Sequence, residues 1–240
     1  MSARDLIAVS GPEALSYLQG QLSQDVGRLA PGETSSSFLL EPTGKVSAWL
    51  QVRRDGNDAF TLAVDAGHGE AVIARLTRFK LRTKVDIGPA DAAGDPLADD
   101  GLAEDERITA GVPRMDAELV KGQTIPAEAG QRIIDASVSF TKGCFTGQEL
   151  VARIDSRGGN VPRHLRLVEI TGSEGDLPPT GADIDVGGSA VGRITSVAWS
   201  PSRSGIVALG YVARAVEPPA AAVVRWEGGE APAQVHNLPR

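Results

Sequence analysis

The stretch VSAWLQVRRDGNDAFTLAVDAGHGEAVIARLTRFKLRTKVDI, residues 46–87, carries the pattern on which the fold prediction depends. Apolar residues alternate with polar ones on both sides of the turn at residues 55–58, which predicts a β-hairpin. Residues 69–80 then show helical spacing, and residues 81–87 alternate again. Residues 36–88 therefore predict a β-β-α-β unit in which one helix covers one face of an antiparallel sheet.

The segments on either side of this unit show other patterns. Apolar positions from Ala14 to Val26 recur at helical spacing, so residues 11–27 predict a helix. Residues 91–106 hold seven acidic residues and no basic one. That composition predicts a solvated linker rather than a docking site for a basic partner. From about residue 165, short β-like runs alternate with Gly and Pro, which predicts a small β-barrel or sandwich.

These patterns together predict an α+β molecule of three parts. Residues 1–30 and 105–167 form a first, discontinuous α+β domain. Residues 31–104 form an inserted β-β-α-β domain between its two halves. Residues 168–240 form a C-terminal β-barrel, because turn signals recur there every 8–12 residues, roughly the spacing of small all-β folds.

The composition excludes several classes of protein. The 240 residues carry 24 Lys and Arg against 31 Asp and Glu, a net charge of −7 that does not favour nucleic acid as a partner. No stretch approaches the ~20 apolar residues of a membrane helix, and the first residues lack a signal pattern, so we expect a cytoplasmic protein. Cys144 is the single cysteine and the three histidines lie far apart. No disulfide and no metal site are therefore predicted.

One segment, residues 140–153 (FTKGCFTGQELVAR), has the composition of a functional site. The spacing of Thr146 and Glu149 predicts a capping box at the start of a short helix. Cys144 would then lie two residues before the N-cap and near Lys142, where the helix dipole and the ammonium favour a thiolate of lowered pKa. From spacing alone an inert, buried Cys144 is the more frequent case, and Glu149 fits a cap that needs no ligand.

The string KGCFTGQE at residues 142–149, followed by Arg153, resembles the signature of the YgfZ family of folate-binding proteins. These are relatives of the aminomethyltransferase (T-protein) of glycine cleavage, and the family includes mitochondrial iron–sulfur assembly factors. The likeness covers nearly the whole chain. Further segments that fit it are GP at 11–12, LQGQ at 18–21, PTGKV at 42–46, RFKLRTKV at 78–85, AGVP at 110–113, IPAE at 125–128 and VGRITS at 191–196.

The resemblance implies three subdomains, ferredoxin-like α+β units plus the barrel, around a central cleft that holds a tetrahydrofolate or a one-carbon derivative. A pterin needs a carboxylate or amide at its edge and apolar walls, and the glutamate tail needs cations. The residues implied are Cys144 and Lys142 as a catalytic pair, Glu149 and Gln148 at the pterin edge, Phe145 and Trp49 as walls, and Arg153, Lys80 and Arg82 at the carboxylates. Two alternatives remain: Trp49 is plain core, and Arg153 pairs with Glu149 on the helix surface.

The sequence departs from the aminomethyltransferases at one point. Where their catalytic aspartate stands in a GGVIDDL-type strand start, this sequence has Ala48 and Trp49, neither of which can act as a general base. Whether the protein is an enzyme therefore stays open.

The function that the resemblance implies is a tetrahydrofolate-binding factor for the assembly or repair of iron–sulfur clusters on client enzymes. Its partners would be folate and either client iron–sulfur proteins or cluster-assembly proteins, with no membrane. The alternatives are a folate-dependent one-carbon (aminomethyl or methyl) transferase and a folate-binding module without catalysis.

Overall fold

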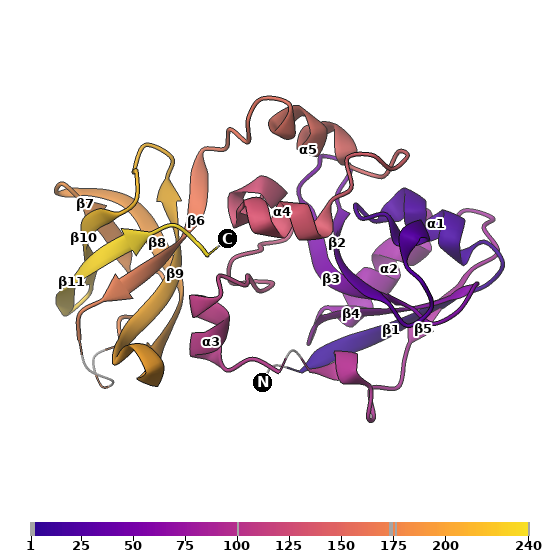
Figure 1. Ribbon diagram of the computed structural model, residues 1–240, viewed down its shortest axis with the longest axis horizontal. Helices are drawn as coiled ribbons and strands as arrows, with labels where there is room; N and C mark the ends of the chain where they lie inside the picture. Colours follow the sequence, from indigo (N-terminus) through magenta and orange to yellow (C-terminus); the bar gives the residue numbers. More distant parts are fainter. Residues whose placement is uncertain (1–2, 100, 173–174, 176, 240) are drawn as a thin grey trace.

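The computed structural model describes residues 3–99, 101–172, 175 and 177–239. It has a mixed α+β fold in which a five-stranded sheet with its helices and a six-stranded barrel lie at opposite ends of an elongated molecule (Figure 1). A mostly helical middle part joins them. The predicted α+β class and the C-terminal barrel are confirmed.

The N-terminal sheet is antiparallel, with the strand order β2-β3-β4-β1-β5. Alternate residues of β3, among them Ala48, Leu50 and Val52, face a core that α1 and α2 complete with Leu18 and Leu76. The elements are β1 (Arg4–Ser10), α1 (Ala14–Gln21), η1 (Val26–Arg28), β2 (Thr34–Leu40), β3 (Val46–Arg54), β4 (Ala59–Asp65), α2 (Gly69–Phe79) and β5 (Asp86–Pro89).

The position of β1 differs from the predicted domain boundaries. β1 lies between β4 and β5 and pairs with β4 along its whole length, for example Ile7 with Leu62. Strand β1, from the predicted first domain, thus shares one sheet with the segment that was predicted to be an inserted domain. The predicted β-β-α-β unit is also incomplete, because three strands precede the helix and β1 adds a fourth.

Helix α1 is shorter than predicted. It ends at Gln21, although the helical spacing of apolar residues continues to Val26. The backbone is extended at Leu22, and the Ser23 N–H donates a hydrogen bond of 3.0 Å to the carbonyl oxygen of Phe38 in β2. The chain leaves the helix because it meets this strand, while Leu22 and Val26 remain in the core.

Part of the acidic segment packs on the sheet and is not a free linker. In η2 (Pro96–Ala98), Leu97 is buried against Leu6 and Ala63. The carboxylate of Asp95 accepts two hydrogen bonds of 2.8 Å from Arg53, and this pairing lowers the pKa of Asp95. The segment therefore covers one end of the sheet face opposite α1 and α2.

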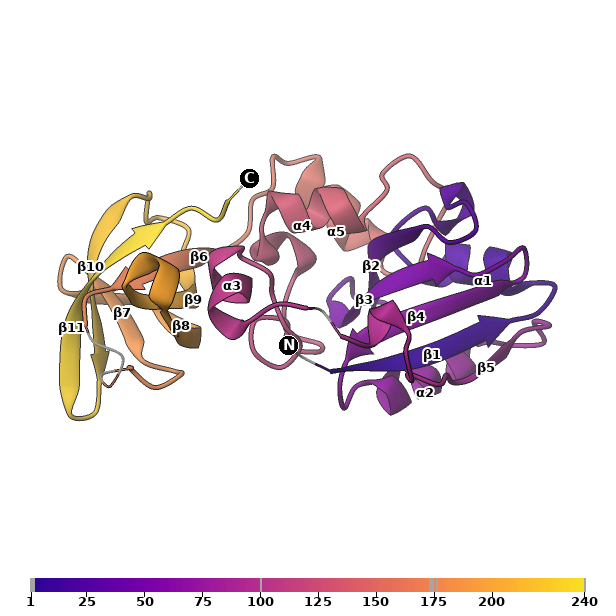
Figure 2. The ribbon, with the colours of Figure 1, turned by 60° about the horizontal axis from the view of Figure 1, so that its bottom comes forward.

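The middle part carries α3 (Glu104–Thr109), η3 (Pro126–Ala129), α4 (Gln131–Ser137) and α5 (Gln148–Asp155). Helix α3 lies against the barrel, whereas α4 and α5 lie over the ends of β2 and β3 (Figure 2). A separate apolar cluster, including Phe38, Leu40, Met115, Ile133 and Val151, joins α4 and α5 to those strands.

The C-terminal barrel is closed, in the order β10-β11-β6-β9-β8-β7. It begins at Arg163, five residues before the predicted boundary at residue 168. Its elements are β6 (Arg163–Ile170), β7 (Asp183–Val186), β8 (Ser189–Ser200), η5 (Pro201–Arg203), β9 (Gly205–Ala213), β10 (Ala220–Trp226) and β11 (Gly229–His236). None of the helices described is long and apolar enough to span a membrane.

A buried carboxylate fixes the barrel to the middle part. Glu118 is 0 % exposed and accepts hydrogen bonds from the hydroxyls of Thr195 at 2.7 Å and Ser196 at 2.6 Å, both in β8. Its other oxygen lies 3.2 Å from the guanidinium of Arg107, which is 1 % exposed. The charge is thus fully paired, as a buried ion requires.

Candidate functional site

The loop of residues 138–147 crosses the end of α1. The ammonium of Lys142 donates hydrogen bonds to the carbonyl oxygens of Leu22 (2.7 Å) and Gln24 (2.9 Å). The Thr146 N–H donates to the carbonyl oxygen of Gly20 at 3.0 Å. The signature segment is therefore tied to residues 20–24 by backbone acceptors that α1 leaves free at its C-terminal end.

Two glycines bring α5 onto the β2–β3 turn. Gly147 has φ +79° and a Cβ there would lie 2.5 Å from the carbonyl oxygen of Glu41. Gly44 has φ +81° and a Cβ there would overlap Leu150. Only glycine fits either position without a shift. This close approach accounts for the glycine in each of the two turns.

The predicted capping box is wrong. Gly147 is the N-cap of α5 and has no side-chain cap, while Thr146 bonds back to Gly20. The side chain of Gln148 instead turns back, and its Oε1 accepts from the Phe145 N–H at 3.1 Å. Glu149 is consequently not used as a cap.

Cys144 is exposed, so the inert, buried alternative does not hold. Lys142 is half-buried, and its charge is held by the two carbonyl oxygens and lies 5.4 Å from the ring centre of Phe145. Burial lowers the pKa of Lys142 to about 8, against a smaller opposing effect of Asp25. The loop thus presents a thiol to solvent while its lysine is turned into the protein.

The other polar residues of α5 lie at the surface. Glu149 and Arg153 are both exposed. No ion pair joins them among the residues that the structure describes, so the predicted alternative of a surface pair is not seen. Phe145 packs with Trp49 against the cluster that holds α5 in place.

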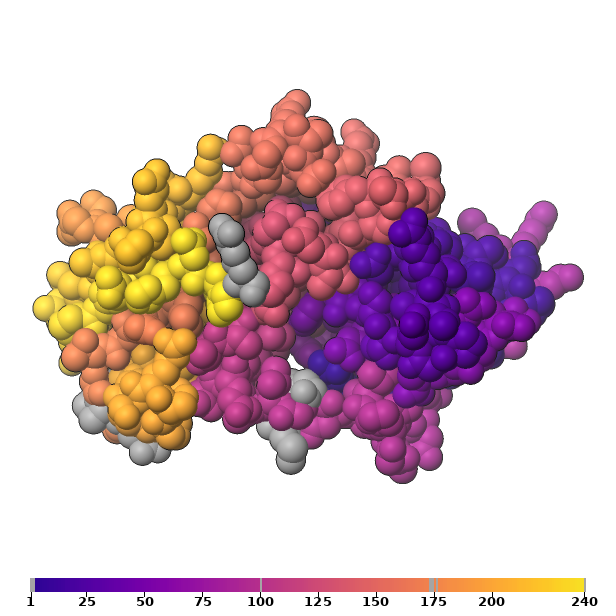
Figure 3. Space-filling view, in the orientation of Figure 1, coloured from indigo at the N-terminus to yellow at the C-terminus, as the bar shows by residue number. Residues whose placement is uncertain are grey.

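Trp49 belongs to the sheet face that is turned away from α1 and α2. Its indole N–H donates to the Ser137 hydroxyl of α4 at 2.9 Å. A narrow crevice of about 10 Å³ adjoins it, lined by Arg4, Trp49, Leu50, Gln51, Ala63 and Asp65. The molecule is hollowed between this sheet and the segment that leads to α3 (Figure 3).

The polar side chains at the crevice can form further hydrogen bonds besides those they make within the protein. Arg4 donates to Gln51 Oε1 at 3.1 Å, and Asp65 Oδ2 accepts from the Met115 N–H at 2.8 Å. The amide nitrogen of Gln51 has no partner within the described ranges. Such amide and carboxylate groups, next to an aromatic wall, suit the edge of a pterin. The crevice itself has room for no more than a water molecule.

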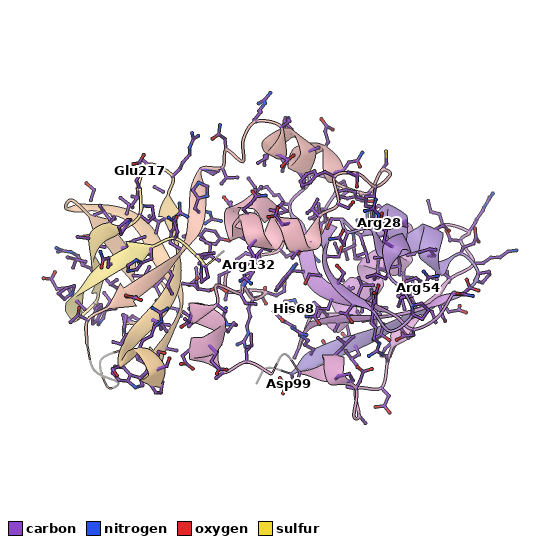
Figure 4. The ribbon with its side chains drawn as sticks, viewed as in Figure 1. Arg28, Arg54, His68, Asp99, Arg132 and Glu217 are labelled. Atoms are coloured by element: carbon purple, nitrogen blue, oxygen red, sulfur yellow. The ribbon has the colours of Figure 1, made fainter. Side chains whose placement is uncertain are left out.

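His68 stands at the side of the same hollow (Figure 4). Its Nε2 lies 3.4 Å from a carboxylate oxygen of Asp116, so the start of α2 and the loop after α3 approach each other there. The sequence analysis assigned neither residue to the site, nor Gln51 and Asp65. The strand alternation that puts Trp49 on this face also puts Gln51 there, which is the signal that was overlooked.

Lys80 and Arg82 lie elsewhere. Lys80 ends α2 and lines a pocket of about 310 Å³ with Thr77 and Asp86, and Arg82 is exposed in the turn that follows. Neither lines the crevice at Trp49. Within the described part of the chain, no group of three or more His, Cys, Asp or Glu side chains could hold a metal ion.

Comparisons with known proteins agree with this architecture. Residues 163–240 match the family of the glycine cleavage T-protein C-terminal barrel domain. The aminomethyltransferase T of the glycine cleavage system from Bartonella henselae superposes with a TM-score of 0.78 at 20% identity, covering 99% of this chain and 84% of that one. The protein therefore has the T-protein fold.

Sequence relatives define the family more closely. A Haemophilus influenzae protein is 32% identical over 190 residues, 65% of this chain and 67% of its own. The tRNA-modifying protein YgfZ of Escherichia coli is 28% identical, covering 75% and 73%. The mitochondrial iron–sulfur cluster assembly factor IBA57 homolog of Neurospora crassa is 25% identical, covering 76% and 55%. The chain belongs to the YgfZ family of T-protein-like proteins.

Proposed function

We propose that this protein binds a tetrahydrofolate in its central hollow and supports the assembly or repair of iron–sulfur clusters on client enzymes in the cytoplasm. The observation that carries the proposal is the exposed Cys144 on a loop that Lys142 and Gly147 hold in one position. A soft thiolate suits iron, but one cysteine is too few to hold a cluster, which takes about four ligands. Cys144 therefore acts as a single, transient ligand or redox thiol next to ligands of the client.

The names of two relatives support this assignment. One is called an iron–sulfur cluster assembly factor and another a tRNA-modifying protein. A cluster-repair factor reconciles both names if its clients include iron–sulfur enzymes that act on tRNA. The acidic net charge of −7 favours contact with such enzymes over contact with the tRNA itself.

For the folate, Trp49 forms a wall and Gln51 and Asp65 offer edge partners below the hollow. The family resemblance adds Glu149 as a further edge partner, and its carboxylate is free to act as one because it is exposed at the start of α5 and does not cap the helix. Bound tetrahydrofolate supplies a one-carbon carrier and a reduced ring. The residues of this chain orient it, and the exposed guanidinium of Arg153 in α5 is available to its carboxylates. Arg82 lies too far from the hollow to take part, in the turn after α2.

The folate part is tested by calorimetric titration with reduced folates. Removing one charged hydrogen-bond partner weakens binding by ~1.5–3 kcal/mol, which we expect for Glu149→Ala. Gln51→Ala should weaken binding less, because the lost partner is uncharged. Asp155→Ala, at the other end of α5, is the matched control and should bind as the wild type does. Unchanged affinity in Glu149→Ala removes Glu149 from the site, and no affinity of the wild type for any reduced folate refutes folate binding.

The cluster part is tested separately. Cys144→Ser should abolish reactivation of a cluster-depleted client enzyme while the affinity for folate stays unchanged. Full reactivation by the serine variant would reduce the protein to a folate-binding module.

A one-carbon transferase is the second candidate, and one observation favours it. Asp65 places a carboxylate on the same sheet face as Trp49, although the position of the transferase aspartate is taken by Ala48 and Trp49. Asp65 would then be the base. Turnover with an aminomethyl or methylamine donor, lost in Asp65→Asn, would favour this function over cluster repair.

A further inference from the structure

A second pocket lies apart from the central hollow, where the start of α4, the start of β6 and residues 237–239 meet. Figure 1 shows the end of the chain between α4 and β6, and Figure 4 labels Arg132 beside it. The pocket has a volume of about 270 Å³. Its basic lining residues are Arg132, His164 and Arg166, and no Asp or Glu is among the described residues that line it. In a chain with net charge −7, this is a local excess of positive charge.

Leu238 closes the apolar side of this pocket. It packs against the cluster of the barrel and α3, and it sits on two glycines, Gly111 and Gly130. A Cβ on Gly111 would lie 2.9 Å from Leu238 Cδ2, and one on Gly130 would lie 3.4 Å from Cδ1. Leu238 is thus closely packed against the folded protein, and the end of the chain is held at the pocket by this packing.

Arg166 is the unusual residue of the pocket. It alternates with Val168 and Ile170 along β6, so it stands on the strand face that lines the barrel core further on. It is half-buried there, and burial lowers its pKa. Its guanidinium has no hydrogen bond or ion pair with any residue that the structure describes. A partly desolvated guanidinium without an acceptor is costly unless a ligand supplies one.

The carboxylate that acts on His164 is already engaged by another arginine. Glu128 in η3 is buried and accepts two hydrogen bonds from Arg163, at 3.1 and 3.2 Å. It therefore balances Arg163 and leaves Arg166 and Arg132 uncompensated. Arg132 donates one N–H group to the carbonyl oxygen of Ala110. The other N–H groups of its guanidinium remain available to a ligand.

The same excess of positive charge affects the pKa of His164. Burial lowers its pKa, and Arg166 on its own strand and Arg214 after β9 lower it further, while Glu128 from η3 opposes them. An anion bound among these groups would act in the opposite direction and raise the pKa of His164. By linkage, the affinity for that anion would increase as the pH falls through the titration of His164.

We propose that this pocket is a binding site for a small, doubly charged oxyanion, held by Arg166 and Arg132 with His164 as a further donor. Guanidinium groups bind phosphate and carboxylate oxygens in pairs, which fits two arginines on facing elements. The volume admits a phosphate or a short dicarboxylate with a few waters, since one water takes about 30 Å³. The site is independent of the folate and cluster functions proposed above.

The protein contains three histidines, so histidine ring signals in NMR spectra give a direct test, with His164→Gln to assign the relevant signal. Inorganic phosphate and glutarate are titrated in parallel at constant ionic strength, which separates a phosphate ligand from a carboxylate ligand. We expect a saturable shift of the His164 signal and a raised pKa of His164 with at least one of them. The signals of His68 and His236 should not move.

Arg166→Gln should weaken this binding by about tenfold or more, the effect of losing one charge-assisted hydrogen bond. Arg132→Gln is the second variant, because it changes an exposed residue and should fold normally. Arg225→Gln, whose arginine pairs with Asp185 and Glu230 on the barrel surface, is the control and should bind as the wild type does. The proposal is overturned if neither ligand gives saturable binding, if all three histidines shift together, or if the control loses affinity to the same extent.

Discussion

The ammonium of Lys142 donates a hydrogen bond of 2.7 Å to the carbonyl oxygen of Leu22, 120 residues earlier in the chain. This bond, together with the one to Gln24, fixes the signature loop to the end of α1. Lys142 therefore does not direct its charge at Cys144, as the sequence suggested. It positions the loop, and Cys144 remains exposed two residues further on.

We expect Lys142 to titrate near pH 8, because burial disfavours its charged form. Its amine should be acetylated by competitive labelling at a pH where other lysines are still protected by protonation. The rapidly labelled site should disappear in Lys142→Met. The labelling rate of Lys142 should level off above about pH 8, and a rate that keeps rising up to the ordinary lysine range near 10.4 would contradict the lowered pKa.

The lowered pKa of Lys142 also predicts how the stability of the protein depends on pH. Since the pKa of Lys142 is lower in the folded protein, the unfolded chain binds more protons between about pH 8 and the ordinary lysine range near 10.4. The free energy of unfolding should therefore rise with pH across this window relative to Lys142→Met. Urea unfolding of both proteins at the two ends of the window measures the difference, and parallel curves would refute the prediction.

Gly147→Ala should destabilise the protein by roughly 1–3 kcal/mol, because its φ is +79° and a Cβ would meet the backbone of Glu41. Gly143→Ala is the matched control in the same loop, since a Cβ there meets nothing within 4 Å. Urea unfolding gives both values. Equal stability of the two variants would show that α5 does not need this close approach.

Cys144 should react with iodoacetamide in the native protein at a rate close to that in denaturant, because the residue is exposed. Mass spectrometry of intact protein should show one label per chain, and none on Cys144→Ser. Protection of the thiol until unfolding would make Cys144 a packing residue, and the proposed function would shift to folate binding alone.

Glu118→Ala should cost about 3–5 kcal/mol, because it leaves the buried Arg107 with an incomplete set of partners and removes the acceptor for two barrel hydroxyls. Glu230→Ala, which breaks an exposed ion pair with Arg225, should change stability by less than ~1 kcal/mol. Chemical denaturation separates the two. A small effect at Glu118 would mean that the barrel docks through its apolar contacts.

The strand and helix patterns were accessible from the sequence where local spacing decides them. The hairpin of β3 and β4, helix α2 and the short barrel strands all follow the alternation or helical period of their own residues. The KGCFTGQE string likewise identified the loop, whereas the exposure of Cys144 came only from the structure. Its detailed structure was not accessible, because Thr146 forms its bonds with Gly20 and not with its own helix.

The sequence by itself thus determined the α+β class, the barrel, most element positions and the family to which the chain belongs. Only the tertiary structure decided that β1 occupies the interior of the sheet, that Lys142 bonds to α1, and that Lys80 lies away from Trp49. The physical reason is the range of the interactions. Periodicity reflects contacts a few residues apart, whereas strand order and site assembly depend on backbone hydrogen bonds and packing between segments that are distant in the chain.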